Sequence, residues 1–186
     1  MSVPVLSSPT STSIPSVSGP TRLRLPDLLH ATDLAAAEVL DGLYDHLLPP
    51  GGIPADDRWF TRLRGDDELD VWLISWAPGH PTELHDHGGS LGALTLVSGA
   101  LDEFRWDGDR LRRRRLEGGD QAAFPLGWVH DVVWARPSVS VSSNEPTLSV
   151  HAYSPPLTAM SYYDVTPRGT LRRARTELTD HPEGNA

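Results

Sequence analysis

Cysteine and lysine are both absent from this chain of 186 residues. Without cysteine, the protein has no disulfide, no thiolate metal ligand, no cysteine nucleophile and no crosslink derived from cysteine. Any metal ion must therefore be held by histidine or carboxylate side chains. All 16 basic residues are arginine, which we interpret as a codon bias rather than as a feature of the chemistry.

Long apolar runs are absent as well. No segment approaches the roughly 20 apolar residues that a membrane span requires. The first residues have neither a charged n-region nor the apolar run of a signal peptide. We therefore expect a cytoplasmic protein that does not bind membranes.

The net charge of −9 argues against nucleic acid as a main partner, because binding to phosphate groups requires a basic surface. One basic run is the exception, the four consecutive arginines at residues 112–115. A strand that places arginine on its exposed side, or at the edge of a sheet, explains this run. We therefore do not expect nucleic acid to be a partner.

The composition favours a mostly β protein, either a sandwich or a barrel. Seventeen prolines and 16 glycines separate many short apolar runs. Residues 1–20 are rich in Ser, Thr and Pro and predict a disordered N-terminal tail. The length suits a single domain, which we place at residues 21–178, followed by a loose C-terminal tail at residues 179–186.

One helix and several strands are predicted from periodicity. Apolar residues recur at helical spacing over residues 33–48, with Thr32 or Asp33 as the cap, and this helix is expected outside the β core. His30 and His46 are expected at its surface. Strand-like runs are present at residues 59–64, 69–76, 93–97, 101–106, 111–116, 148–153, 160–165 and 171–178. The first two runs, and those at 101–106 and 111–116, are joined by turn residues and predict two hairpins.

A pair of histidines gives the first indication of a functional site. His85 and His87 are two residues apart, and in an extended chain such residues point to the same face. Because neutral imidazole is the commonest metal ligand, the pair predicts a metal site; the alternative is a polar strand edge. Farther along, Ser149, His151 and Tyr153 share one face of a strand, which is either exposed to solvent or lines a pocket.

The spacing of glycine, histidine and proline resembles the two motifs of the cupin superfamily. The first motif corresponds to Gly79, His85, His87 and Gly99, and the second to Gly119, Pro125, Gly127 and His130. Gly92 stands where the first motif usually has glutamate, and Trp134 stands where the second usually has asparagine. The resemblance implies an all-β cupin fold, that is, a double-stranded β-helix or jelly-roll barrel with a few N-terminal helices. It also implies a metal site formed by His85, His87 and His130.

Two further segments resemble the thiol dioxygenases, in particular the bacterial form of the cysteine dioxygenase type I family. One is Ser-Val-His-Ala-Tyr-Ser-Pro-Pro at residues 149–156, and the other is Trp-Phe-Thr-Arg at residues 59–62. The resemblance extends over residues 30–165. It implies an Fe(II)-dependent enzyme of cysteine catabolism that uses O₂ to oxidise L-cysteine to L-cysteine sulfinic acid, and we expect it to be a monomer.

The resemblance also assigns roles to individual residues. Arg62 would bind the carboxylate of the substrate, with Phe60 and Tyr153 in the same substrate site. Tyr153 would donate a hydrogen bond to the bound thiolate or to oxygen, oriented by His151, which Ser149 orients in turn. 3-Mercaptopropionate dioxygenases generally have glutamine at the position of Arg62. The arginine therefore favours L-cysteine as the substrate.

The chain departs from the family pattern at three positions. Gly92 lies where vertebrate members have a cysteine crosslinked to the active-site tyrosine, so Tyr153 would act without a crosslink. Phe60 replaces a tyrosine that is usual there, which removes one possible hydrogen bond to the substrate. Met160 lies where some members have another cysteine.

Three neutral histidines would leave iron its full double charge, which favours an anionic thiolate. Three positions of an octahedron then remain for the thiolate, the amine and O₂. Glu83, two residues before His85, is an alternative fourth ligand because it could share the same strand face. Asp86, between the two histidines, would point the other way, and His80 is interpreted as structural.

Three other functions stay open. The chain could be a dioxygenase of 3-mercaptopropionate or another small thiol, a non-catalytic metal-binding cupin such as a sensor, or a zinc cupin. The presence of Arg62 and Tyr153 argues against a binding module, which needs neither side chain. The identity of the bound metal would separate the iron and zinc alternatives.

Overall fold

A computed structural model describes residues 23–138 and 145–182 of the chain. The predicted N-terminal tail at residues 1–20 and the end of the predicted C-terminal tail at residues 183–186 lie outside the described residues. The middle of the polar loop before the strand that carries Tyr153 lies outside them too, at residues 139–144.

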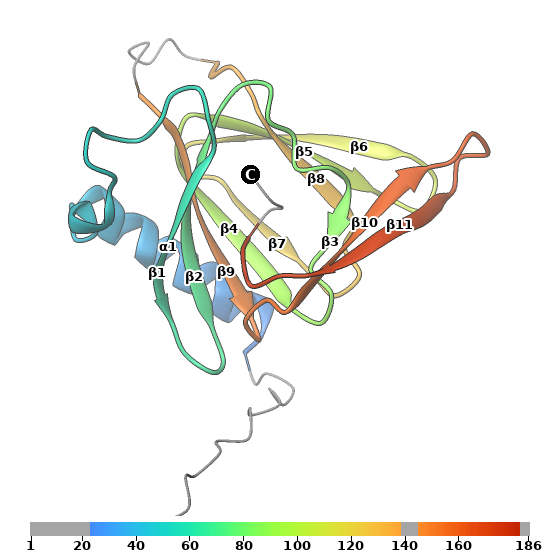
Figure 1. Cartoon of the computed structure of the whole chain (residues 1–186), viewed down its shortest axis with the longest axis horizontal. Coiled ribbons are helices and arrows are strands. Elements are labelled where there is room, and N and C mark those ends of the chain that lie inside the picture. Colours follow the sequence, from blue (N-terminus) through green and yellow to red (C-terminus); the bar gives the residue numbers. More distant parts are fainter. Residues whose placement is uncertain (1–22, 139–144, 183–186) are drawn as a thin grey trace, which may run out of the picture.

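Two antiparallel sheets face each other and form a barrel (Figure 1). The five-stranded sheet contains, in spatial order, β1 (Trp59–Gly65), β2 (Asp70–Trp76), β9 (Thr147–Ser154), β4 (Leu91–Ser98) and β7 (Gln121–Phe124). The six-stranded sheet contains β11 (Leu171–Leu178), β10 (Ala159–Val165), β3 (His85–Asp86), β8 (His130–Trp134), β5 (Ala100–Trp106) and β6 (Leu111–Glu117). This double-stranded β-helix confirms the predicted all-β cupin class.

Apolar side chains at alternate strand positions fill the interior of the barrel. Along β4 and β7, Leu94 and Phe124 point inward, and along β5 and β8 Leu101 and Val132 do the same; all four are fully buried in one cluster. Because successive strand residues point to opposite faces, polar residues at the inward positions are held inside this core. That is where the site residues lie.

A second apolar layer covers the outer face of the five-stranded sheet. The helix α1 (Leu25–Leu40) lies across this face (Figure 1), and its buried side chains contact the outward residues of β2, β4 and β9. Leu28 and Ala35 are fully buried there, against residues such as Val71 and Val150. The prediction of a helix outside the β core is confirmed.

The predicted bounds of that helix, residues 33–48, are wrong. The helix begins at Leu25, with proline in its first turn and Asp27 bonded to the backbone N–H of Arg24. Thr32 is therefore not a cap but a buried residue inside the helix, where it hydrogen-bonds Thr95 on β4. Past Leu40 the chain continues only as the short 3-10 helix η1 (Asp45–Leu47), because Gly42 adopts a φ of 77°.

The predicted hairpins and final strands are confirmed. β1 pairs with β2, β5 with β6, and β10 with β11. Strand β6, which carries the four arginines, lies at the edge of its sheet, as the sequence indicated. His30 and His46 are exposed, also as predicted. None of the described helices is long and apolar enough to cross a membrane.

Gly99 shows why one motif position requires glycine. It connects β4 to β5 with a φ of 78°, in the left-handed region that side chains disfavour. A Cβ atom at this position would lie 2.7 Å from the Cβ of Thr147 on the neighbouring strand. The turn can therefore pack this closely only because no side chain is present.

Candidate metal centre and substrate pocket

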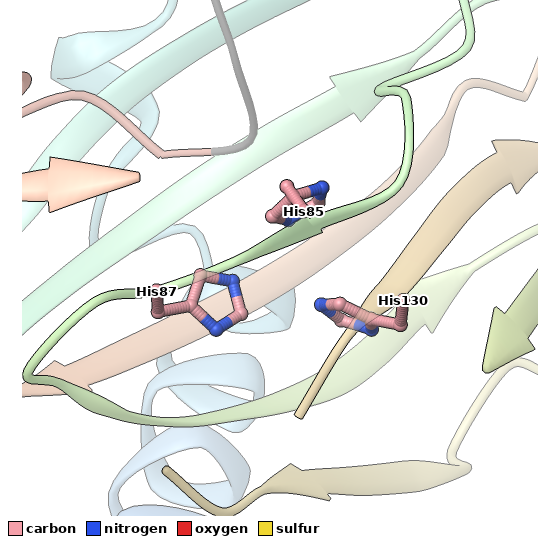
Figure 2. Close-up of side chains that lie close together, drawn as sticks. All are labelled: His85, His87 and His130. Carbon is pink, nitrogen blue, oxygen red and sulfur yellow. The ribbon is translucent and has the colours of Figure 1, made fainter. Parts of the chain in front are cut away.

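Three histidines meet inside the barrel. His85 lies in β3, His87 follows this strand directly, and His130 begins β8, where it pairs in register with His85. Figure 2 shows the three imidazoles turned toward one point, and their ligand nitrogens lie within 4.8 Å of one another. All three side chains are buried. The predicted grouping of His85, His87 and His130 is present in the structure.

The far side of the His85 ring is fixed by the backbone. Its Nδ1 lies 2.8 Å from the carbonyl oxygen of Glu83. A carbonyl can only accept, so Nδ1 carries the proton and Nε2 presents its lone pair to the cluster. Glu83 itself adopts a φ of 66°, which is uncommon for a residue with a side chain. The backbone conformation there brings the carbonyl beneath the imidazole.

The far side of the His130 ring is fixed by a buried carboxylate. Oε1 of Glu103 on β5 lies 3.1 Å from His130 Nδ1 and also accepts a hydrogen bond of 3.1 Å from the indole of Trp128. Burial opposes ionisation of Glu103, but these hydrogen bonds outweigh it and hold the pKa of the carboxyl below its usual value. The imidazole therefore donates from Nδ1 and is oriented by a negative charge.

This arrangement fits a transition metal ion. The Nε2 atom of His130 is buried and makes no hydrogen bond to the described residues, although buried nitrogen acceptors are normally paired. Imidazole groups with fixed protons on their far side are ligands suited to iron or zinc. Among the described residues, no carboxylate joins the three histidines in the group.

The two acidic residues nearest the histidines in sequence point elsewhere. The carboxylate of Glu83 forms an ion pair of 2.8 Å with Arg175, and its side chain is 58% exposed. Asp86 accepts hydrogen bonds from the hydroxyl of Tyr163 at 2.6 Å and from the N–H of Gly88 at 2.9 Å. Glu83 therefore does not lie among the metal-binding nitrogens, and Asp86 points away from them as predicted.

A chain of hydrogen bonds runs along β9 toward the histidines. Ser149, His151 and Tyr153 are all fully buried on the inner face of the strand. The Oγ of Ser149 lies 3.0 Å from His151 Nε2, and His151 Nδ1 lies 3.1 Å from the hydroxyl of Tyr153. The ring of Tyr153 is 5.0 Å from the ring of His87, measured between centroids. Of the two alternatives left open by the sequence, exposure to solvent is therefore excluded, and the three side chains lie inside the barrel beside the histidines.

Trp76 on β2 lies at the other end of this chain. Its indole N–H, which can only donate, is 2.8 Å from the Oγ of Ser149. The hydroxyl proton of Ser149 is thereby free to point toward His151. With His151 accepting at Nε2 and donating from Nδ1, the oxygen of Tyr153 would accept this hydrogen bond and keep its own phenolic proton.

Arg62 lies on the inner face of β1. It pairs in register with Trp72, which belongs to the inner core, and its guanidinium forms an ion pair with Asp70 on β2. Asp70 pairs in register with Tyr153, so these side chains follow one another across adjacent strands. The backbone of Gly65 leaves room for the ion pair, because a Cβ there would overlap both side chains.

The two members of this ion pair differ in exposure. The side chain of Arg62 is 48% exposed, whereas that of Asp70 is 4% exposed. Burial raises the pKa of Asp70, and the neighbouring Arg62 offsets this only in part. The neighbouring Arg64 does not share the site, because a β-bulge turns it to the outer face, where it pairs with Glu38 on α1 at 3.1 Å.

Aromatic rings pack together on the strands next to Arg62. Phe60 packs edge-on against Trp72, with 6.0 Å between ring centroids. After β11 the chain runs back toward the five-stranded sheet (Figure 1), where the ring of His181 lies 5.6 Å from Phe60 and 6.2 Å from Trp72. Pro182 is buried next to it. The predicted C-terminal tail thus packs, through His181, against the aromatic rings of β1 and β2.

Three residues of the site were not identified from the sequence: Asp70, Trp76 and Glu103. Each follows the period-two pattern of inward positions on its strand, and each is a polar or amphipathic side chain at a position that would otherwise be apolar. An acidic residue at an inward strand position is a usable signal, since buried carboxylates are rare unless paired. His80 bonds the carbonyl of Asp56 at the surface, which agrees with its structural interpretation.

Known proteins resemble the chain over this part of the sequence. A family model described as "Cysteine dioxygenase type I" matches residues 55–166, more than half of the chain. "Cysteine dioxygenase type 1" of Danio rerio is 28% identical over 104 residues, covering 54% of this chain and 52% of the relative. The protein of the same name in Rattus norvegicus is 27% identical over 122 residues, covering 63% and 59%. The chain thus spans between about half and three-fifths of the length of these relatives.

Solved structures of double-stranded β-helix proteins are also similar. One is an uncharacterized conserved protein with such a domain from Klebsiella pneumoniae, with 18% sequence identity and a TM-score of 0.45 over 70% of this chain and 93% of that one. The matched region of the family model contains Arg62, all three histidines and Tyr153.

Proposed function

The chain belongs to the cysteine dioxygenase type I family, and from this premise we propose that it is an Fe(II)-dependent cysteine dioxygenase that converts L-cysteine to L-cysteine sulfinic acid. The observation that carries the proposal is the buried group of three histidines with Tyr153 beside His87. Small-molecule partners, namely the thiol and O₂, follow from the family.

The proposed reaction is balanced without a further reductant. A thiol R–SH and O₂ give R–SO₂⁻ and a proton, so two S–O bonds form, the sulfur loses four electrons and both oxygen atoms are reduced. Iron held by His85, His87 and His130 would supply a redox-active Lewis acid at which the thiol and O₂ meet. The remaining steps depend on the side chains of this chain.

Arg62 is the proposed anchor of the substrate carboxylate. A guanidinium has five N–H donors, and Asp70 accepts from only one of its nitrogens, so donors remain for a second carboxylate. The pair of Arg62 and Asp70 has a net charge of zero. A substrate head group that is itself neutral overall, such as the ammonium and carboxylate of L-cysteine, suits this environment better than the single negative charge of 3-mercaptopropionate.

Tyr153 is the proposed proton donor. Its hydroxyl is buried, which strengthens a hydrogen bond to a thiolate or to a developing oxyanion. His151, Ser149 and Trp76 hold the phenol by successive hydrogen bonds of 3.1, 3.0 and 2.8 Å. Phe60 and Trp72 would exclude water from the substrate; Phe60 has no hydrogen-bonding group, whereas the indole N–H of Trp72 is buried without a partner among the described residues.

The test is product analysis on the iron-loaded protein. Oxygen uptake and sulfinate formation are measured with L-cysteine, 3-mercaptopropionate and cysteamine in parallel. We expect L-cysteine to have the highest kcat/KM, with about one O₂ consumed per sulfinate. Turnover of another thiol without sulfinate from L-cysteine would refute the substrate assignment. Tight iron binding without turnover of any thiol would instead indicate a non-catalytic metal-binding cupin.

Two neighbouring arginines provide a matched pair of variants. Arg62→Gln should raise KM for L-cysteine at least tenfold, because the charge-assisted contact with the carboxylate is lost. Arg64→Gln removes the same charge from the opposite face of the strand, where Arg64 pairs with Glu38 on α1, and should leave KM within twofold. Equal effects of the two substitutions would contradict the proposed role of Arg62.

A further inference from the structure

A cavity lies where β6 and β7, the edge strands of the two sheets, approach each other. Its volume is about 560 Å³, within the range of small-molecule sites. It is lined by Glu103 and Arg105 of β5, Asp107 in the turn after β5, Arg112 and Arg114 of β6, Ala123 of β7, and Trp128. The Nη2 of Arg114 donates a hydrogen bond of 2.8 Å to the carbonyl of Gln121, which ties β6 to β7 at this point.

Strand alternation divides the four consecutive arginines of β6 between two faces. Arg113 and Arg115 point to one face, where both form ion pairs with Asp102, at 2.8 and 3.4 Å. Arg112 and Arg114 point to the other face, toward the cavity. The register of β6 on β5 places Arg112 opposite Arg105 and Arg114 opposite Glu103. The four consecutive arginines therefore form two pairs that lie on opposite faces of the strand.

Two guanidinium groups of the cavity have no carboxylate within ion-pair distance among the described residues. Arg105 lies with its guanidinium carbon 4.2 Å from the centroid of the Trp128 ring. Stacking on an aromatic ring uses the face of the guanidinium and leaves its N–H donors at the edge. Arg114 bonds only the neutral carbonyl of Gln121. Both groups retain N–H donors and a full charge.

The acidic groups of the cavity are already engaged. Glu103 accepts from His130 and Trp128 through one oxygen. Asp107 forms an ion pair of 2.5 Å with Arg112 and accepts hydrogen bonds from two backbone N–H groups in its turn. The carboxylate of Glu103 lies opposite Arg114 and attracts it, so the three guanidinium groups and two carboxylates of the lining leave a net charge of +1, although the chain as a whole has a charge of −9.

We propose that this cavity is an anion site in which the guanidinium groups of Arg105 and Arg114 bind a tetrahedral oxyanion, either free phosphate or sulfate or the phosphate group of a small metabolite. Planar guanidinium groups bind such oxyanions through paired N–H donors. Arg105 stacks on Trp128, and Arg114 donates a hydrogen bond to Gln121. These contacts order both guanidinium groups before an anion binds, which reduces the entropy lost on binding. The site does not depend on the proposed dioxygenase function.

The experiment is calorimetric titration of the full chain, at constant ionic strength maintained with sodium chloride. Sulfate, inorganic phosphate and glycerol 3-phosphate are titrated in turn. We expect saturable binding at one site per chain. Tighter binding of glycerol 3-phosphate than of phosphate would identify a metabolite as the source, and equal binding would identify the free ion.

The run of arginines supplies the control. Arg114→Gln and Arg105→Gln should each weaken binding about tenfold or more, since each removes a charge-assisted contact. Arg113→Gln removes the same charge one residue away, from the opposite face, and should change the affinity less than twofold. Thermal unfolding of each variant shows that the fold is retained. The absence of saturable binding, or an equal loss in Arg113→Gln and Arg114→Gln, would overturn the proposal.

Discussion

Replacement of Glu103 tests whether a carboxylate outside the metal-binding atoms sets the affinity of the centre. The Oε1 of Glu103 accepts both from His130 Nδ1 and from Trp128, each at 3.1 Å. In Glu103→Gln, an amide oxygen can still accept both bonds, but the negative charge that polarises the imidazole is gone. In Glu103→Ala, the acceptor itself is lost and His130 can rotate.

The expected losses follow from these contacts. Removal of a partner that orients a metal-binding histidine typically lowers metal affinity 10- to 100-fold. We therefore expect about a tenfold loss for Glu103→Gln, near 1.4 kcal/mol, and about a hundredfold loss for Glu103→Ala, near 2.7 kcal/mol. The dissociation constant is measured by competition with a chelator of known affinity, with Fe(II) under argon and with Zn(II) in air.

Asp102→Asn is the matched control, because Asp102 is adjacent in sequence but points to the opposite face, toward Arg113 and Arg115. This variant should bind metal as tightly as the parent chain. Urea unfolding of the metal-free proteins separates a loss of metal affinity from a loss of folding stability. If Glu103→Ala binds iron with unchanged affinity, or if Asp102→Asn loses as much, the orientation of His130 by Glu103 is refuted.

Three further predictions concern catalysis, packing and pH. Tyr153→Phe should lower kcat for sulfinate formation by about 10² to 10⁴, with metal affinity unchanged, since only the buried hydroxyl is lost; parallel losses in metal affinity would argue against a proton-donor role. Gly99→Ala should destabilise the fold by about 1–3 kcal/mol in urea unfolding, because a side chain there meets Thr147, whereas Gly119→Ala, which also has a positive φ but open space around it, should cost less. The hydrogen bond from Arg112 and two backbone N–H groups hold the pKa of Asp107 well below its usual value; its contribution to stability is therefore present above the unfolded-state pKa and is lost as the pH falls through the folded-state value. The difference in unfolding free energy between the parent and Asp107→Asn should shrink toward pH 2, and a constant difference would contradict this assignment.

Much of the fold could be predicted from the sequence because the signals are local. Period-two alternation and turn residues located the hairpins, and the positions of His85, His87 and His130 relative to the motif glycines indicated the metal centre. The helix bounds could not be obtained in this way. The apolar spacing continues to Leu47, but the backbone turns at Gly42, and the capping of the helix by Arg24 and Asp27 has no strong sequence signature.

From the sequence alone it was possible to say which residues of a strand share a face, because the alternation along a strand depends only on the order of residues. The sequence therefore predicted that Ser149, His151 and Tyr153 share a face. Which strands lie side by side is seen only in the tertiary structure. The contacts of Glu103 with His130 and of Arg62 with Asp70 depend on that strand order. The partners in each contact come from different strands, and the register that joins them is a property of whole sheets. A β-bulge in one strand is enough to turn a neighbouring arginine to the opposite face.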